Sequence, residues 1–458
     1  ILLKYVINIF TRIFFLFTQR TVRTFSIDNI NDFKQYLLAW SRQFETIVWL
    51  DSNNYKQPYS AFDCALAVEE FTAIKTDYQH AFEKLKEYQT NTKDYIFGYL
   101  SYDVKNDVEQ MTSNNLDSLN FADLYFFQPQ KLIFIKGTQV EFHYLKMIAD
   151  EIEGDFKEIK LGVQASTEPP KTALEIKRRT PKAQYLQKVT QVIEHIKRGD
   201  IYEANFCQEF YAENVTIDPF EVYGHLNDIS SPPFAAFLKM DAHYLLSASP
   251  ERYLKKEGIK VISQPIKGTA KRVVNNKDDK KIATDLSRDE KERAENVMIV
   301  DLVRNDLSKT AKIGTVKVEE LCKVHSFKQV HQMISTVVSE VDEKLHPVEI
   351  IRSTFPMGSM TGAPKVSAMN IIENLEETKR GLYSGAVGYF TPEHDFDFNV
   401  VIRSILYNQE TKYVSYTVGG AITAKSIPEK EYEECLLKAK AMQYVLMNAR
   451  VSLLQTIE

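Results

Sequence analysis

The sequence predicts an α+β fold, in which strands and helices are mixed without a regular β-α-β alternation. Short runs rich in β-branched and aromatic residues occur along the whole 458-residue chain and read as buried strands. Longer stretches with apolar residues at helical spacing stand between them, but they do not follow the strands one for one. A doubly wound parallel sheet would need that one-for-one order, so we expect a different arrangement.

Composition is that of an ordinary globular chain, with 44% apolar and 26% charged residues. The length is enough for two domain-sized units or for one large merged fold. A net charge of −5 gives no sign of the basic face that a nucleic-acid partner needs. The four cysteines lie far apart and form no Cys-x-x-Cys pair, so we expect reduced cysteines in a cytoplasmic protein.

Residues 1–24 are an apolar N-terminal extension of uncertain role. The apolar run ends near Phe17, is interrupted by polar residues, and is shorter than the roughly 20 apolar residues of a membrane span. No small-residue cleavage site follows it. It is interpreted as an extension upstream of the natural start, with a packed helix or strand and a membrane or export element as alternatives. We expect the folded domain to begin near Phe25.

The first region of the domain, residues 25–163, is predicted to mix strands with helical segments and carries no motif with obvious chemistry. Its expected strands are residues 47–50, 95–102, 132–135 and 140–144, and residues 82–88 are expected in a helix. A polar, proline-bearing stretch follows, and we predict a linker over residues 164–179.

The second region, residues 180–448, is more strongly patterned. An amphipathic helix is predicted over residues 182–198, ending at Gly199, which is a favourable helix stop. Further expected helices are residues 289–303, 365–375 and 429–446. Expected strands are residues 201–211, 234–246 and 413–418, the last of them ending at Gly419-Gly420.

The first chemical motif joins Ser249-Pro250-Glu251 to the sequence PIKGT at residues 265–269. Gly258 and the β-branched residues around it predict two strands joined by a turn, which would bring Glu251 close to Lys267. A carboxylic acid and an amine across one cleft can act as general acid and nucleophile. The alternative is a surface ion pair on a hairpin.

Two predicted helices carry carboxylates on one face. Glu292 and Glu295 are three residues apart, and Glu431, Glu434 and Lys438 fall at helical spacing. Two carboxylates and an ammonium group can serve a metal ion and an anionic substrate. The alternatives are a solvated acidic stripe and an i, i+4 surface pair.

A glycine-containing loop at residues 358–365, GSMTGAPK, precedes a predicted helix. Glycines let backbone N–H groups approach an anion, and a helix N-terminus adds favourable partial charge. As a pattern on its own it can equally be a simple turn.

The order of these motifs carries more weight than any one of them. The run SPER, PIKGT, AEN-MIVDL-RNDL, GSMTGAPK, YSGAVGY, IRSI, VGGAI and EYEE-K, between about Thr180 and Leu446, resembles the chorismate-utilising enzymes. This family includes anthranilate, aminodeoxychorismate, isochorismate and salicylate synthases. The stretch Trp49-Leu50-Asp51-Ser52 looks like a short motif of the first two groups. The resemblance implies two large mixed β-sheets packed as a sandwich with flanking helices, as in anthranilate synthase component I.

The resemblance also implies a magnesium ion and a set of substrate ligands. The positions that match the family's metal ligands are Glu295 and Glu434, with Glu431 bound through a water. Mg²⁺ takes a few carboxylates and keeps several waters, so the residue types are suitable. Chorismate has two carboxylates, which suit an arginine fork, a lysine and free N–H groups. The matching substrate anchors are Arg403, Tyr383, Lys438 and the backbone around Thr361, Gly419 and Gly420.

Lys267 distinguishes between the possible products. Family members that make anthranilate usually have PIAGT here, and those that make 4-amino-4-deoxychorismate usually have PIKGT. The implied role of Lys267 is attack on ring C2 with loss of the C4 hydroxyl, which Glu251 protonates. Ammonia then adds at C4 and expels the lysine. The neutral amine that this attack needs is favoured by burial or by nearby positive charge.

Three departures from the family pattern accompany this lysine. Glu203 stands where water-adding members have a lysine base and amine-adding members commonly have glutamine. Gln332, preceded by His331, occupies the usual histidine place, and Ala421 replaces the third glycine of a GGG run. The lysine base is missing, which argues against water addition.

The expected activity is conversion of chorismate and ammonia to 4-amino-4-deoxychorismate, for p-aminobenzoate and folate synthesis. Anthranilate formation for tryptophan synthesis is the alternative, and a non-catalytic chorismate-binding module is a third possibility. No nucleophilic cysteine in a glycine elbow is present, so we expect a separate glutamine amidotransferase subunit to deliver the ammonia. No nucleic-acid or membrane partner is expected.

Overall fold

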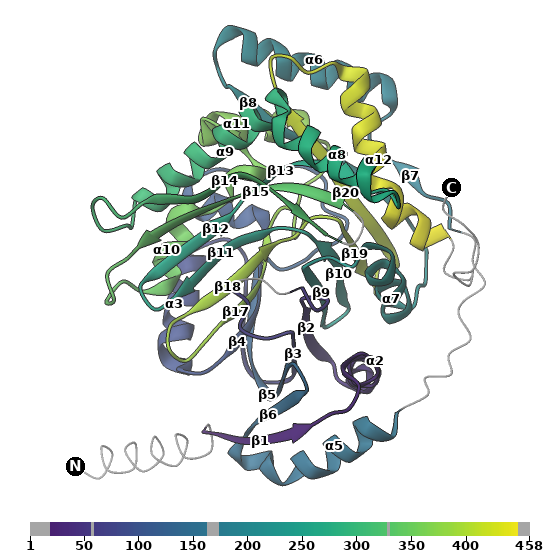
Figure 1. The fold of residues 1–458 in the computed structure, drawn as a ribbon, viewed down its shortest axis with the longest axis vertical. Helices are drawn as coiled ribbons and strands as arrows, with labels where there is room; N and C mark the ends of the chain where they lie inside the picture. The colour runs from purple at the N-terminus through teal and green to yellow at the C-terminus, as the bar shows by residue number, and fades with distance from the viewer. Residues whose placement is uncertain (1–18, 56–58, 163–173, 328–329, 448–458) are drawn as a thin grey trace.

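The structure, a computed structural model, describes residues 19–55, 59–162, 174–327 and 330–447 (Figure 1). The predicted apolar extension therefore lies outside the described residues up to position 18, as does most of the predicted linker. None of the described helices is both long enough and apolar enough to cross a membrane.

Twenty strands and eleven α-helices make up the described part of the chain. The strands are β1 (Arg20–Ser26), β2 (Thr46–Asp51), β3 (Cys64–Thr76), β4 (Ile96–Leu100), β5 (Leu124–Lys136), β6 (Gln139–Leu145), β7 (Lys177–Arg178), β8 (Glu203–Ala212), β9 (Phe234–Met240), β10 (His243–Ser249), β11 (Arg252–Glu257), β12 (Lys260–Gln264), β13 (Ile266–Lys271), β14 (Lys317–Ser326), β15 (Val330–Glu340), β16 (Gly362–Ala363), β17 (Ala386–Phe390), β18 (Phe396–Val400), β19 (Ser404–Asn408) and β20 (Tyr413–Ile422). The α-helices are α2 (Ile30–Trp40), α3 (Ala81–Thr92), α4 (Lys105–Val108), α5 (Ile152–Leu161), α6 (Lys182–Arg198), α7 (Pro219–Ser230), α8 (Asn276–Arg288), α9 (Glu290–Ser308), α10 (Pro347–Thr354), α11 (Lys365–Leu375) and α12 (Pro428–Met447), with short 3₁₀ turns that include η4 (Gly358–Met360).

The strands form one hydrogen-bonded network that branches at β5. One branch runs through β3, β2, β9, β10, β19, β20 and β8, and the other through β4, β17, β18, β11, β12 and β15. The first half of β5 pairs with β4 and its second half with β6, while β3 lies along its other side. Two layers can therefore face each other while sharing one strand.

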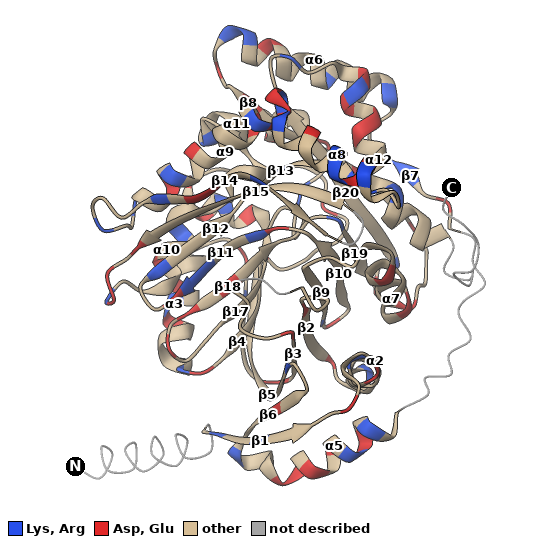
Figure 2. Ribbon diagram, in the orientation of Figure 1, with Lys and Arg blue, Asp and Glu red and all other residues tan. Residues whose placement is uncertain are grey.

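The main core lies between the two layers, and a second core lies under the helices that cover one of them. Strand β2 shows this by alternation, because Val48 packs in the first core and Ile47 and Trp49 pack in the second. Helices α2, α5, α6, α7 and α12 contribute to the second core, whereas α9 and α10 contribute to the first. Figure 2 shows charged residues along the outer helices, such as α5, α6 and α12, and also on strands such as β11 and β14.

The predicted α+β class is confirmed. The expected sandwich of two mixed sheets is instead formed by one connected network of antiparallel ladders. All ladders between the described strands are antiparallel, and they join into one network. Strands from the two sequence regions also pair with each other, since β2 pairs with β9 and β4 pairs with β17. The regions 25–163 and 180–448 follow each other in the sequence, and their strands are hydrogen-bonded to each other in one network.

Element boundaries agree best where a cap residue is present. Helix α6 covers 182–198 as predicted, because Gly199 adopts a left-handed conformation at φ 89° and ends it. The predicted strand 234–246 is instead the hairpin β9–β10, which turns at Asp241 with φ 54°. Strand β20 continues past Gly419-Gly420 to Ile422, since its ladder with β8 runs on to Ala204.

Two described segments fall in ranges that the sequence assigned to an extension and a linker. Strand β1 starts at Arg20, ahead of the expected domain start at Phe25, and pairs with β6 over its whole length. Its mostly polar sequence, RTVRTFS, gives little strand signal because it lies at an edge of the sheet and is largely exposed. Strand β7, at the end of the predicted linker, pairs with β8.

Candidate active site

Lys267 projects from β13 and forms an ion pair with Glu203 of β8. The Lys267 Nζ and Glu203 Oε1 atoms are 3.0 Å apart, and the two side chains are 11% and 1% exposed. The other carboxylate oxygen of Glu203, Oε2, has no hydrogen-bond partner among the described residues. Lys267 is therefore a buried group of the molecule, not part of a surface hairpin pair.

The surroundings of Lys267 favour its charged form. Burial lowers the pKa of its amine, but the negative charges of Glu203, Glu295 and Glu251 outweigh burial, and the net pKa is raised. Neither burial nor positive charge supplies the neutral amine that the sequence argument required. The proton on Lys267 has to be removed before this amine can attack.

Glu251 lies in the bend between β10 and β11, and only 5% of it is exposed. Its backbone carbonyl accepts a hydrogen bond from the Val400 amide at 3.0 Å, which ties the bend to β18. Burial raises the pKa of its carboxyl to about 7, against the opposing effects of the Ser359 hydroxyl and Lys267. A carboxyl with this pKa is partly protonated near neutral pH and can donate a proton.

The carboxylates of α9 are directed to the same place. Burial raises the pKa of Glu295 to about 7, while Lys267 and Lys291 oppose that rise. The Glu295 Oε1 atom has no hydrogen-bond partner among the described residues, and Lys291 Nζ lies 3.7 Å from it. Glu292 lies beside Gly268, where an added Cβ would be 3.1 Å from its Oε2.

Helix α12 brings a second set of charges to β20. Lys438 Nζ lies 2.7 Å from Glu434 Oε1 and donates to the Gly419 carbonyl at 2.9 Å. A Cβ on Gly420 would lie 3.6 Å from Glu431 Oε2 and 3.7 Å from Glu434 Oε1, so both carboxylates reach this glycine. Lys291 of α9 feels the charges of Glu295, Glu431 and Glu434, all of which raise its pKa against the lowering effect of burial.

These carboxylates do not form a ready metal cage. Over the parts of the chain that the structure describes, no three His, Cys, Asp or Glu side chains are grouped so that they could hold a metal ion. Mg²⁺ needs fewer, because it is commonly bound through one or two carboxylates and keeps several waters. The unpartnered Glu295 Oε1 and the nearby Glu434 carboxylate suit such an ion.

The predicted substrate anchors differ in how far their polar groups are already engaged by contacts within the protein. None of the described residues forms an ion pair with the half-buried Arg403. Burial lowers the pKa of its guanidinium, although the charges of Tyr383 and Glu434 act to raise it. The Tyr383 hydroxyl is 3.6 Å from the Cys207 thiol. The Thr361 amide and hydroxyl both donate within the η4 turn, to Gly358 and Met357, so they do not point free N–H or O–H groups at a ligand.

A buried arginine that the sequence argument missed holds several of these parts together. Arg380 forms a two-bond ion pair with Glu376, and it donates to the Met360 carbonyl at 2.6 Å and the Asn205 carbonyl at 2.7 Å. Glu376 in turn accepts the Cys207 amide at 2.9 Å. Strand β8 and the η4 turn are therefore joined through one guanidinium. The i, i+4 spacing of Glu376 and Arg380 was the available signal.

The histidine and glutamine departures lie on β15, beside β13. His331 is buried, with its ring nitrogens 2.8 Å from Ser326 Oγ and 3.1 Å from Asp279 Oδ1. Gln332 pairs with Thr269 in the β13–β15 ladder, and its Oε1 has no hydrogen-bond partner among the described residues. His331 is thus occupied by structural contacts.

Comparison with known proteins gives a consistent picture. A family model described as chorismate binding enzyme matches residues 45–444. The chain is 32% identical over 383 residues to aminodeoxychorismate synthase component 1 of Bacillus subtilis (strain 168), covering 80% of this chain and 81% of that protein. It is also 32% identical over 356 residues to anthranilate synthase component 1 of Thermus thermophilus, covering 76% of each.

Solved structures show the same fold at lower sequence identity. Anthranilate synthase component I from Streptococcus pneumoniae TIGR4 superposes with a TM-score of 0.73 at 24% identity, over 85% of this chain and 95% of that one. The menaquinone-specific isochorismate synthase from Escherichia coli superposes with a TM-score of 0.72 at 16% identity, over 94% of this chain and 95% of that one.

Proposed function

Because the chain belongs to the chorismate binding enzyme family, we propose that it is the chorismate-converting component of an aminodeoxychorismate synthase. It would combine chorismate with ammonia to give 4-amino-4-deoxychorismate, a precursor of p-aminobenzoate and folate. Relatives that carry this name include proteins from Bacillus subtilis and from Escherichia coli, the latter 40% identical over 251 residues.

The observation that carries the proposal is the position of Lys267. Its amine is buried beside Glu203 and feels the charges of Glu251 and Glu295, the residues to which family resemblance assigns an acid and a metal ligand. For packing alone, an apolar residue would stabilise this position better than a lysine buried among three carboxylates. A chemical role accounts for it.

In the proposed reaction Lys267 attacks ring C2, and the C4–O bond breaks as Glu251 donates its proton to the departing hydroxyl. Lys267 first loses a proton, and Glu203 is the carboxylate in hydrogen-bonding contact with it. Ammonia then forms a bond to C4, and the bond between Lys267 and C2 breaks. Glu251 is left as a carboxylate.

Glu295 and Glu434 would hold the magnesium ion, with Glu431 acting through a water. Bound there, Mg²⁺ would offset the negative charge of these residues and of a substrate carboxylate. Arg403 would bind the second carboxylate of chorismate, since it has no ion-pair partner among the described residues. Lys438 and Tyr383 would line the same space.

The ammonia would come from a separate glutamine amidotransferase. Relatives named component 1 support this proposal, because the name implies a second component. A high concentration of ammonium should replace that partner in an assay near neutral pH, where a small fraction of it is present as ammonia and Glu251 is still partly protonated.

The test is to incubate the purified protein with chorismate, ammonium and Mg²⁺ and to identify the product by mass and absorbance. We expect 4-amino-4-deoxychorismate, and no product when a chelator removes the metal. Anthranilate as the main product would instead assign the chain to the anthranilate synthases, which it also resembles at 32% identity.

Lys267→Ala separates covalent catalysis from simple binding. We expect the variant to lose activity by about 10³-fold or more while it still folds. Lys271→Ala, which removes an exposed lysine of the same strand, is the matched control and should keep full activity. Full activity of Lys267→Ala with chorismate, ammonium and Mg²⁺, and with no other amine added to replace the lysine side chain, would disprove covalent catalysis.

A further inference from the structure

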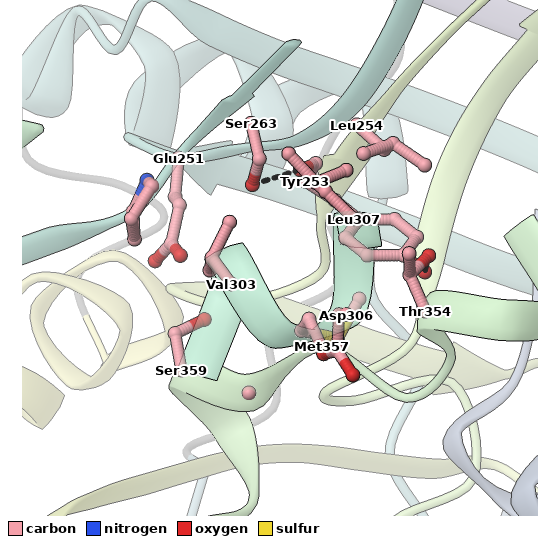
Figure 3. Close-up of a pocket in the computed structure, with 12 residues that line it drawn as sticks. Glu251, Tyr253, Leu254, Ser263, Val303, Asp306, Leu307, Thr354, Met357 and Ser359 are labelled. Carbon is pink, nitrogen blue, oxygen red and sulfur yellow. Dashed lines mark hydrogen bonds between the residues drawn. The ribbon is translucent and has the colours of Figure 1, made fainter. Parts of the chain in front are cut away.

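A small cavity borders Glu251 and is separate from the ion pair of Lys267. Residues of β11, β12, α9, α10 and the η4 turn line it, and Lys267, Glu203 and Glu295 do not. Figure 3 shows Glu251 and Ser359 at one end of the cavity, with Asp306 and Thr354 at the other. Glu251 therefore has a second side that the proposed substrate site does not use.

The size and lining of the cavity suit one water molecule. It offers about 20 Å³ to the centre of a water-sized sphere, and about 10–15 Å³ of such space is enough to hold one water. Buried waters also need two to four polar partners. The polar side chains on the lining are those of Glu251, Tyr253, Ser263, Asp306, Thr354 and Ser359.

The far end of the cavity leads toward a solvent-facing charge. Asp306 is buried, and its two oxygens lie 2.9 Å from Lys309 Nζ and 2.6 Å from Lys365 Nζ. Lys365 is buried, whereas about half of the Lys309 side chain is exposed. The Asp306 end of the cavity is thus tied to an ammonium group that is in contact with solvent.

We propose that this cavity binds a water molecule that returns a proton to Glu251 in each turnover. The inference rests on the proposed function, in which Glu251 gives its proton to the C4 oxygen and that oxygen leaves as water. The cavity water then donates one proton to the Glu251 carboxylate and accepts one from solvent at the Asp306 end. One proton enters per turnover, and the cavity water is not consumed.

A separate route is needed because the direct one is closed. Only 5% of Glu251 is exposed, so bulk water has little direct contact with its carboxyl. Chorismate bound beside Lys267 and Glu251 would cover that side further. The cavity lets the acid be recharged without opening the substrate site.

Val303→Ile tests the proposal, because Val303 of α9 lines the cavity and one added methyl group would occupy the water's space. We expect kcat to fall about tenfold, since proton supply to a general acid becomes limiting. The KM for chorismate should not change, and the solvent deuterium isotope effect on kcat should rise. Val300→Ile, on the same helix and buried but not on the lining, is the matched control and should behave as wild type.

A crystal structure of the wild-type protein gives a readout that does not depend on activity. We expect a water hydrogen-bonded to Glu251 in the cavity, and its loss in Val303→Ile. A dry wild-type cavity would overturn the proposal. The proposal would also be overturned if the isoleucine of Val303→Ile filled the cavity and the variant still had the wild-type kcat and solvent isotope effect.

Thr354→Val keeps the test decisive if Val303→Ile does not fold. This change retains the side-chain shape and removes one hydroxyl from the lining, which also contacts the Tyr253 hydroxyl at 2.7 Å, so kcat should fall in the same direction by a smaller factor. If the wild-type protein makes no 4-amino-4-deoxychorismate, the proposed function fails on its own. The crystallographic water would still decide whether the cavity is a water site.

Discussion

The contact between Lys267 and Glu203 sets two demands on the same pair of side chains. At 3.0 Å the carboxylate holds the ammonium in place, and it also raises the pKa of the amine that has to become neutral. The demands are compatible if the proton moves from Nζ to the carboxylate when substrate is bound. Glu203 then acts as a base, and its departure from the family's usual residue has a purpose.

Glu203→Gln tests this role. Glutamine keeps a hydrogen-bonding side chain at the position but cannot take the proton, so we expect kcat to fall by about 10²–10⁴-fold. Steady-state kinetics with chorismate and ammonium measure it. Glu213→Gln, a surface carboxylate that follows the same strand and pairs with Lys177, serves as the control. A rise in kcat for Glu203→Gln would mean that Glu203 only stabilises the ammonium.

The pH dependence of the reaction should report Glu251. Its pKa is raised from 4.5 to about 7 by burial, so the carboxyl is protonated below about pH 7 and ionised above it. A general acid works only in the protonated form, and kcat/KM should therefore decline as pH rises through about 7. In Glu251→Gln that decline should be absent from the residual activity. A decline that persists unchanged in the variant would assign it to another group.

At the residue scale, the sequence predicted the identities better than the contacts. Lys267 and Glu251 belong to recognisable motifs, and both lie in the candidate site. The partner of Lys267 was not predictable, because Glu203 is 64 residues away in the sequence and belongs to a strand that reaches it only through tertiary folding. Arg380 was missed for the same reason, since its carbonyl partners come from β8 and the η4 turn.

Among the elements, β20 carries two adjacent glycines with different surroundings. A Cβ at Gly419 would lie 2.4 Å from the Phe206 carbonyl oxygen and 2.5 Å from the Cys207 sulfur. At Gly420 the nearest atom would be Lys438 Nζ at 3.5 Å, which is ordinary contact. The first glycine lets two strands approach, and the second keeps space open in front of α12.

Alanine substitutions should separate these functions. We expect Gly419→Ala to lower the free energy of unfolding by about 1–3 kcal/mol, because the strand has to shift away from β8. Gly420→Ala should leave thermal stability near wild type and raise the KM for chorismate, since its methyl group enters the substrate space. Thermal unfolding and steady-state kinetics on both variants measure this. Equal losses of stability in the two variants would contradict the distinction.

Predictions at the element scale succeeded where local sequence decides the outcome. Helices α6 and α11 begin and end where expected; proline precedes each of them, and Gly199 ends α6. The turn between β9 and β10 was missed, since it contains no glycine and uses Asp241 in a left-handed conformation. Strand β20 was cut short because glycines weaken a strand pattern, although here its ladder partner sustains it.

In the whole molecule, the strands of the first sequence region lie between two groups of strands from the second region, within one hydrogen-bonded network. Strand β2 lies between β3 and β9, and β4 lies between β5 and β17. If the two regions were produced separately, β2 and β9, and likewise β4 and β17, would each lose a hydrogen-bonding neighbour and become exposed sheet edges. The α+β class could be predicted from local patterns, but the pairing between the two regions could not, because the paired strands lie roughly 190 to 290 residues apart.

We expect the chain to unfold in one cooperative transition. Both tryptophans, Trp40 and Trp49, lie in the first region, whereas circular dichroism reports on the whole chain. The urea midpoints from tryptophan fluorescence and from circular dichroism should therefore coincide. A fragment of residues 25–163 should be insoluble or unfolded. Two separate midpoints, or a stably folded fragment, would show that the regions are independent.

The contacts of Arg380 also bear on how the family can diversify. All five of its N–H donors are engaged, and its partners include backbone carbonyls that no substitution can remove. A mutational library at position 380 alone should yield almost no active clones, whereas a library at positions 376 and 380 together should yield active clones in which both residues have changed. By contrast, the side chains of β8 project from a backbone that this guanidinium anchors. Directed evolution toward a new nucleophile can therefore replace Glu203 without loosening the strand that presents it, because Arg380 holds the backbone of β8 at Asn205, and what is lost is the base that contacts Lys267.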